Sequence, residues 1–298
     1  MITENEIMIP LFDFDYTGVV EIEKFWSQKY DLSSLPEDYS FFDKNIRLKS
    51  FEINRDYPEM EMDFFSPYEK RCMQESKWCI SITENEANHT QYSQYINLLL
   101  IAFRVYFDSQ CYIKYKFSKA NPNNDIKLLA TFLKIPSSEL GKRIFNKNEL
   151  AKVDNAFSNI VKLFDQSFRA RHALDFMFLG FTEYYALSRF ILLMTSIESF
   201  YLPSKKSWIK ETLKERIPKF LNNQAIENYL DDIYKIRSDI THGKLKTDLY
   251  MKEFLPKVLL LQNILTETLK KIFDGNLIDI YKDESTKEEY FASLFTTK

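Results

Sequence analysis

Glycine is scarce in this sequence of 298 residues, which contains only five glycines, all far apart. Phosphate-binding loops need clustered glycines, because their backbone must approach the ligand closely and adopt positive φ angles. The chain has no GxGxxG pattern, and neither Gly141-Lys142-Arg143 nor Gly243-Lys244-Leu245 completes the GK[ST] end of a P-loop. The sequence therefore argues against dinucleotide-binding and P-loop chemistry.

Histidine and cysteine are equally sparse, with three of each. The histidines stand far apart without an HExxH pattern, and the odd number of cysteines shows no CxxC spacing. These patterns exclude the common zinc motifs and argue against a disulfide framework. We expect reduced thiols, no metal site and no cofactor.

Long hydrophobic runs are also missing. The most apolar tract, residues 176–202, is interrupted by Glu183, Arg189 and Glu198, so its uncharged run is far below the ~20 residues that span a bilayer. Residues 1–15 hold four acidic residues and no basic one, which is unlike a secretory signal. We therefore expect a cytoplasmic protein that does not associate with membranes.

Charge is distributed unevenly. Residues 1–100 hold nine Lys/Arg against nineteen Asp/Glu, whereas residues 203–257 hold twelve against eight. A polyanion would be repelled by the first region and attracted to the second, unless both charge sets are simply solvated surface. The 45% of apolar residues and 16% of aromatic residues predict a folded chain.

The first part of the chain predicts an α+β domain over residues 1–145. Short apolar runs at 46–53, 78–82 and 111–117 are typical of strands, and residues 92–106 are apolar at helical spacing. Ile135-Pro136-Ser137-Ser138 indicates a break before the second domain. Because residues 1–145 lack a nucleophile or metal constellation, we predict a mixed α/β regulatory or sensing domain.

Residues 146–298 predict an all-α bundle. We expect helices near 147–172, 181–202, 206–221, 223–242 and 248–273, with Pro203 ending the second and Gly243 following the fourth. Ser207 and Thr247 are the expected N-caps. The helix at 181–202 should cross the middle of the bundle, because one face carries an apolar stripe of Ala186, Phe190, Leu193, Ile197 and Phe200.

The fourth predicted helix ends in the sequence LDDIYKIRSDITHGK, residues 230–244. This ending resembles the "lYxxRSxxxHG" motif of Apea-like HEPN domains, and Arg237 and His242 have the R-x4-H spacing of that family. The segments 186–190, 196–200 and 213–221 also resemble the family's order of elements. The resemblance covers residues 147–273 and leaves residues 1–145 outside it.

The resemblance implies a dimeric helical bundle with ribonuclease activity in phage defence, toxin or RNA-processing systems. Cleavage through the ribose 2′-OH requires proton transfer and positive charge at the phosphate. A histidine titrates near neutrality, and an arginine binds phosphate oxygens in a bidentate way. We therefore assign proton transfer to His242 and phosphate binding to Arg237, with two copies of each in a dimer and no metal.

Several roles remain open from the residues alone. On an undistorted helix Arg237 and His242 lie about 140° apart, so the helix must end at His242 or the pair must converge across a dimer interface. If the two residues have a purely structural role, Arg237 would stack on Tyr234 and His242 would cap the C-terminus of the helix. Asp239 either orients the His242 ring or pairs with Lys235.

Five further side chains belong to the predicted site. Glu198 matches a helix-borne glutamate of the family, although it is equally well explained as a core-edge residue bonded to Arg189. Ser238 follows Arg237 as in the Apea-like branch. The predicted RNA contacts are Lys235, Lys244 and Lys246.

Three functions are consistent with these residues. The first is an endoribonuclease, with a phage-derived trigger or an antitoxin as its expected partner; the others are a catalytically silent HEPN module that binds RNA and a dimerisation scaffold in a defence complex. Both motif residues are intact, which favours the enzyme.

Overall fold

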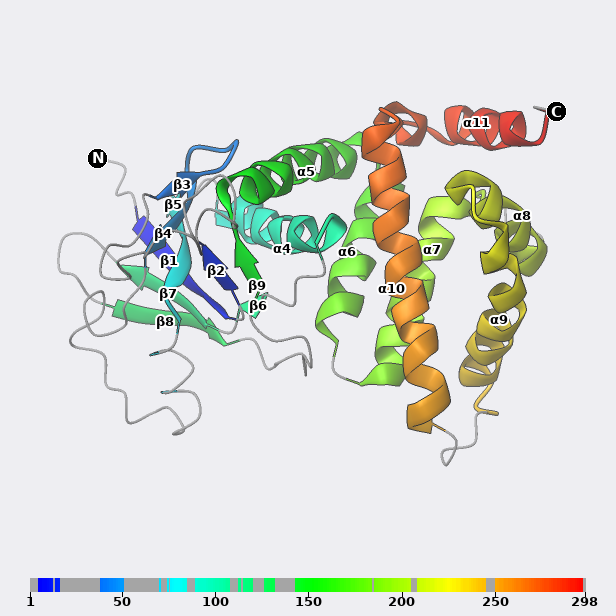
Figure 1. Cartoon of the computed structure of the whole chain (residues 1–298), viewed down its shortest axis with the longest axis horizontal. Helices are drawn as coiled ribbons and strands as arrows, with labels where there is room; N and C mark the ends of the chain where they lie inside the picture. Colours follow the sequence, from blue (N-terminus) through cyan, green and yellow to red (C-terminus); the bar gives the residue numbers. More distant parts are fainter. Residues whose placement is uncertain are drawn as a thin grey trace, which may run out of the picture. The chain divides into compact units, whose positions relative to one another are not determined.

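The computed structural model describes residues 5–12, 14–16, 38–50, 70, 74, 76–84, 89–107, 112–113, 115–119, 126–131, 143–183, 185–204, 208–244 and 250–296. The chain forms two compact units, Met1–Asn155 and Ala156–Lys298. The first contains an antiparallel sheet with helical segments, and the second is helical (Figure 1). The predicted α+β class is therefore confirmed.

The sheet of the first unit has the strand order β3-β4-β5-β1-β7-β8, with β6 pairing beside β1. Its paired strands are all antiparallel. The bounds are β1 Asn5–Phe12, β3 Tyr39–Ser40, β4 Ile46–Ser50, β5 Trp78–Glu84, β6 Tyr112–Ile113, β7 Tyr115–Lys119 and β8 Ile126–Thr131. A separate parallel pair joins β2 (Phe14–Tyr16) to β9 (Arg143–Phe145).

The predicted strands correspond to β4, β5, β6 and β7, and the predicted helix corresponds to α4 (His89–Val105). Residues 98–103 of α4 are all buried, which is typical of a helix inside a core. β1 was not predicted, although it lies between β5 and β7. Its Asn5, Glu6 and Pro10 weaken the local strand signal.

The second unit consists of helices built around α7. The bounds are α5 Lys147–Gln166, α6 Phe168–Thr182, α7 Ala186–Tyr201, α8 Ile209–Leu221, α9 Glu227–Thr241, α10 Tyr250–Asp274 and α11 Glu284–Thr296, with short 3-10 helices η2 Gln224–Ile226 and η4 Ile278–Tyr281. Helices α6, α8, α9 and α10 all contact α7. The predicted central helix is confirmed.

Helix α7 is held by close packing and by buried hydrogen bonds. The α6 backbone approaches closely at Gly180, where an added Cβ would lie 2.7 Å from Leu193. Ser196 Oγ donates to the Ala173 carbonyl at 2.7 Å, and the buried Tyr201 and Thr268 hydroxyls are 2.7 Å apart. Because buried polar groups need partners, these bonds fix the register of α7 against α6 and α10.

The two compact units divide inside α5, whereas the expected boundary at 145/146 lies before this helix. Asp154 explains why the first part of α5 belongs to the first unit. Its carboxylate accepts a hydrogen bond of 2.7 Å from the backbone N–H of Phe42.

The helix predicted over 181–202 begins later, at Ala186, because residues 181–182 belong to α6, and two further boundaries also differ from the prediction. The expected helix over 147–172 was wrong, because Ser167 has extended backbone and its Oγ accepts a 3.1 Å hydrogen bond from the N–H of Ala170, starting α6. Helix α8 begins after Trp208, which has a left-handed φ of 60°. The predicted caps Ser207 and Thr247 lie outside the described residues. Helix α11 was not predicted.

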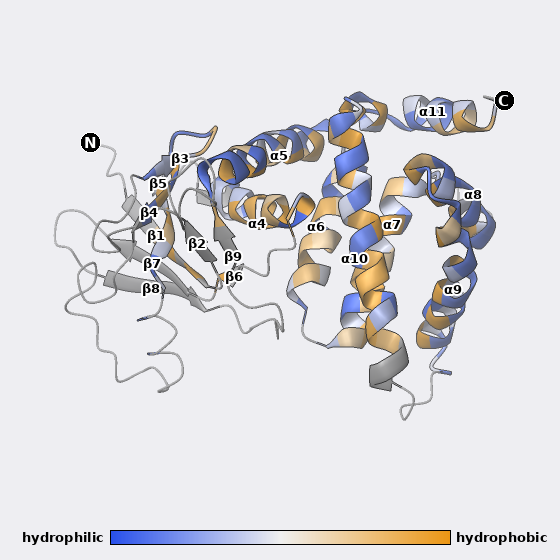
Figure 2. Ribbon diagram, in the orientation of Figure 1, coloured by the Kyte–Doolittle hydropathy of each residue, from blue (hydrophilic) through white to orange (hydrophobic). Residues whose placement is uncertain are grey.

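Within the described residues, no helix combines the length and apolar character needed to cross a membrane. Figure 2 shows hydrophilic residues interrupting the hydrophobic ones along α7 and α10.

Candidate functional site

Helix α9 ends in a Schellman motif that positions the predicted catalytic histidine. Gly243 adopts a φ of +64°, and its N–H bonds to the Ile240 carbonyl at 3.1 Å. The N–H of Lys244 bonds to the Asp239 carbonyl at 2.8 Å. These are the two hydrogen bonds that define the motif. Consequently the helix stops at Thr241, and His242 is its exposed C-cap.

Arg237 lies one turn earlier and forms an ion pair with Glu198 of α7. Its Nε is 3.2 Å from Glu198 Oε1, and the exposed fractions of the two side chains are 28% and 8%. A carboxylate with so little exposure requires a cation or hydrogen-bond donors. The pair therefore links α9 to α7 and fixes the place of the guanidinium.

The structure bears on two open interpretations of this region. Glu198 pairs with Arg237, whereas Arg189 donates from Nε to the Glu183 carbonyl at 2.9 Å. Among the described residues, no hydrogen bond or ion pair joins the Asp239 carboxylate to the His242 ring or to Lys235. Asp239 contributes its backbone carbonyl to the helix end instead.

The remaining predicted residues surround the end of α9. The Ser238 carbonyl accepts a hydrogen bond of 3.0 Å from the N–H of His242. Lys235 and Lys244 are exposed, and Lys246 lies outside the described residues. The described part of the site thus contains Arg237, Glu198 and Ser238 in partly or largely buried positions, with His242 and two lysines in solvent.

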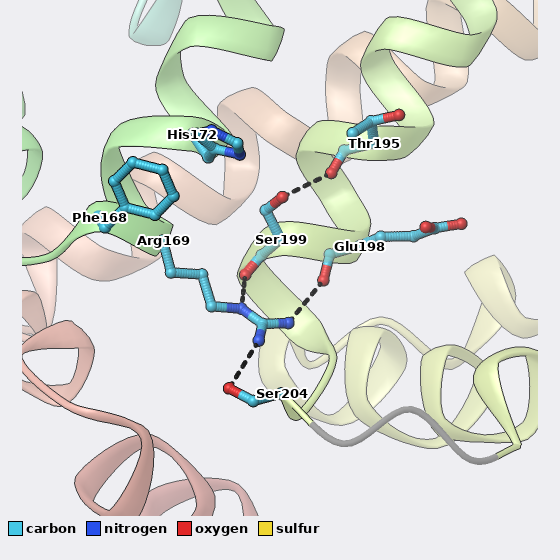
Figure 3. A pocket seen from close by; sticks show the side chains of 7 residues that line it. All are labelled: Phe168, Arg169, His172, Thr195, Glu198, Ser199 and Ser204. Carbon is cyan, nitrogen blue, oxygen red and sulfur yellow. Dashed lines mark hydrogen bonds between the residues drawn. The ribbon is translucent and has the colours of Figure 1, made fainter.

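A pocket of about 390 Å³ lies between α6 and α7. Its lining residues are Phe168, Arg169, His172, Thr195, Glu198, Ser199 and Ser204. Figure 3 shows the Glu198 side chain extending away from Phe168. Glu198 therefore belongs both to the pocket wall and to the ion pair with Arg237.

Arg169 lines this pocket and caps the end of α7 (Figure 3). Its Nε donates to the Ser199 carbonyl at 2.8 Å, and its Nη2 donates to the carbonyls of Glu198 and Leu202. Its Nη1 donates to Ser204 Oγ at 3.3 Å. The positive charge also faces the negative end of the helix dipole. Burial lowers the pKa of Arg169, and the nearby Glu284 opposes this effect.

Two more cations reach the same helix end. Arg216 of α8 donates to the Tyr201 carbonyl at 2.8 Å and also binds Glu288 of α11. Lys287 of α11, whose side chain is 2% exposed, donates to the Leu202 carbonyl at 2.7 Å. Burial, together with repulsion from Arg169, lowers the pKa of Lys287 to about 8, although Glu284 acts in the opposite direction.

Sequence reasoning missed the pocket and this group of cations. The available signal was the i, i+4, i+8 spacing of Phe168, His172 and Phe176, which form successive ring contacts at 4.5 and 5.6 Å. The Arg169 contacts had no local signal, because they join residues about thirty positions apart: 30 positions to Ser199 and 33 to Leu202.

Within the described ranges, no three His, Cys, Asp or Glu side chains are grouped so that they could hold a metal ion. Searches against protein-family models, curated proteins and solved structures gave no significant match for this chain.

Proposed function

We propose that this chain is a metal-independent endoribonuclease of the HEPN type, acting in the cytoplasm in phage defence or as the toxin of a toxin–antitoxin system. Arg237 and His242 would be its catalytic pair. Lys235, Lys244 and Lys246 would bind the RNA, and residues 1–145 would sense a phage-derived trigger or an antitoxin.

The observation that carries the proposal is the Arg237–Glu198 ion pair beside the end of α9. The buried carboxylate holds the guanidinium in one place, while 28% of the Arg237 side chain remains exposed. His242 follows five residues later as an exposed C-cap. A guanidinium paired with a buried carboxylate, five residues before an exposed imidazole, supplies the two groups that phosphate binding and proton transfer require.

The proposed reaction proceeds in one transesterification step. His242 accepts the proton of a ribose 2′-OH, and the 2′-oxygen bonds to the adjacent phosphorus while the bond from phosphorus to the 5′-oxygen breaks. A second proton donor, which would be His242 of a second copy of the chain, protonates the leaving 5′-oxygen. Arg237 binds the phosphate oxygens as their negative charge develops. The products are a 2′,3′-cyclic phosphate and a 5′-hydroxyl.

The same ion pair also favours a second candidate function. Arg237 already has a partner that ties α9 to α7, so its position is explained without catalysis. The chain would then be a silent HEPN module that binds RNA or dimerises within a defence complex. The two functions differ in what His242 does, because its side chain is exposed and contributes little to packing.

The deciding experiment is RNA cleavage by the full chain in the presence of EDTA. We expect cuts that end in 2′,3′-cyclic phosphates, loss of cleavage in His242→Ala, and no change in Tyr229→Ala, which alters another exposed side chain of α9. Unchanged circular dichroism would show that His242→Ala still folds. Dependence on Mg²⁺, 5′-phosphate products or full activity of His242→Ala would contradict the enzyme proposal.

A further inference from the structure

The pocket between α6 and α7 has an open aromatic edge. The Phe168 side chain is 73% exposed, and its ring centroid lies 4.5 Å from that of His172. A single exposed apolar residue is ordinary on a protein surface. Here, however, the ring borders a pocket of about 390 Å³, a volume within the range of small-molecule sites.

Arg169 does not make this pocket a phosphate site. A guanidinium has five N–H donors, and those of Arg169 face the carbonyls of Glu198, Ser199 and Leu202, the Ser204 hydroxyl and the Glu284 carboxylate. Its donors are therefore occupied by protein groups. A phosphate would have to displace several of these hydrogen bonds.

Of the three hydroxyl groups that line the pocket, those of Thr195 and Ser199 are hydrogen-bond acceptors toward a ligand, whereas that of Ser204 accepts from Arg169 Nη1. Thr195 Oγ1 donates to the Ile191 carbonyl at 2.9 Å, and Ser199 Oγ donates to the Thr195 carbonyl at 2.8 Å. Because each hydroxyl has one proton, both oxygens offer only lone pairs to a ligand. The pocket thus presents acceptors next to an aromatic face.

We propose that this pocket binds a nucleobase that carries an exocyclic amino group. The base would stack on Phe168 and donate from its amino group to Ser199 Oγ or Thr195 Oγ1. Adenine, cytosine and guanine have such a donor, whereas uracil does not. This inference rests on the proposed ribonuclease function, because it makes the pocket a base-selective subsite of the same bundle, with Glu198 shared between the pocket and Arg237.

Mononucleotide binding to the full chain tests the pocket without any cleavage. We expect AMP and CMP to bind more tightly than UMP in calorimetric titrations. Phe168→Leu keeps an apolar side chain but removes the ring, so it should weaken AMP binding about tenfold, whereas Phe168→Tyr should stay within about twofold. Leu179→Ala changes another exposed residue of α6 and is the matched control.

Ser199→Ala tests the acceptor separately. It should reduce the preference for AMP over UMP and leave the fold intact, since the Ser199 hydroxyl donates within its own helix, to the Thr195 carbonyl. Equal binding of AMP and UMP, no binding of any mononucleotide, or tight binding by Phe168→Leu would overturn the proposal. If the chain binds AMP as expected but cuts no RNA, the ribonuclease proposal fails and the pocket stands. If Phe168→Leu cuts RNA with the same base preference as the wild type, the proposal for the pocket fails and the ribonuclease proposal stands.

Discussion

Arg237 combines two properties that a single substitution can separate, its charge and its planar shape. Lysine keeps the charge opposite Glu198 but has no planar pair of donors for phosphate. We expect Arg237→Lys to unfold at nearly the wild-type temperature and to lose about 100-fold or more of its cleavage rate. Initial rates on an end-labelled RNA measure this loss.

The control for this variant is Arg171→Lys, the same exchange at an exposed position of α6 to which no role in the site is assigned. It should cleave at close to the wild-type rate. A fully active Arg237→Lys protein would show that Arg237 acts only through its charge.

The lowered pKa of Lys287 predicts that stability depends on pH with a sign opposite to that expected for a lysine in a surface ion pair. Its pKa is lowered from 10.5 to about 8 in the folded state, chiefly because the charge is buried. Between these values the unfolded chain binds a proton that the native chain does not. The contribution of this group to the free energy of unfolding therefore rises as the pH increases from about 8 to 10.5, by up to about 3 kcal/mol. Below pH 8 the lysine is charged in both states, and the native state bears the full cost of burying that charge.

Urea unfolding of the wild type and of Lys287→Met at pH 7 and pH 9.5 tests this prediction. Methionine fills a similar volume without charge, so the variant should be as stable as the wild type or more stable at pH 7. The wild type should gain relative to the variant at pH 9.5. A wild type that loses stability relative to Lys287→Met on raising the pH would contradict the sign.

Residue patterns identified some of these groups and not others. Arg237 and His242 were predicted from their motif, and Glu198 from its match to the helix-borne glutamate of the family that the sequence resembles. Phe168 and Arg169 were not: the aromatic spacing of Phe168 and His172 was overlooked, and the role of Arg169 depends on carbonyls at the end of another helix. Hydrogen bonds between helices leave no periodic signal in the sequence.

At the level of elements, the end of α9 depends on one backbone conformation. Gly243 has a φ of +64°, and an added Cβ would meet no described atom within 4 Å. The penalty of Gly243→Ala is therefore in the backbone alone, about 1 kcal/mol. We expect this loss in chemical unfolding, together with reduced cleavage because His242 moves as the Schellman motif rearranges.

Gly243→Asn is the matched variant, because asparagine tolerates left-handed φ better than alanine. It should recover part of the stability and part of the activity. If alanine and asparagine behave alike, the φ of this position does not control His242.

Helices were predicted well where one apolar face was long, as in α7 and α10. The break at Ser167 was missed because apolar residues continue on both sides of it. Helix α11 was missed because it buries few residues, among them Lys287 and Phe291. Its place in the bundle depends on charged contacts with the end of α7, which local propensity does not report.

For the whole molecule, the proposed reaction requires more than one copy of the chain. Each chain supplies one Arg237 and one His242, whereas the reaction needs both a proton acceptor and a proton donor. We expect the full chain to sediment as a C2 dimer at micromolar concentration. An active monomer under the same conditions would exclude this arrangement.

Mixing experiments provide the control. His242→Ala mixed in excess with the wild type should lower cleavage more than dilution alone, because heterodimers retain one imidazole. Cleavage that falls only in proportion to the wild-type fraction would contradict a shared site.

The capped end of α7 also sets an order of events during synthesis on the ribosome. The bond from Lys287 to the Leu202 carbonyl joins residues 85 positions apart. At about 5 to 20 residues per second, Lys287 follows Leu202 by roughly 4 to 17 s. Arg237 and His242 are made about halfway through that interval, while the helix that carries Glu198 still lacks its last cap. The bundle is completed only after α11 has been made, so the proposed ribonuclease activity would begin late, after the proposed catalytic residues have been synthesised.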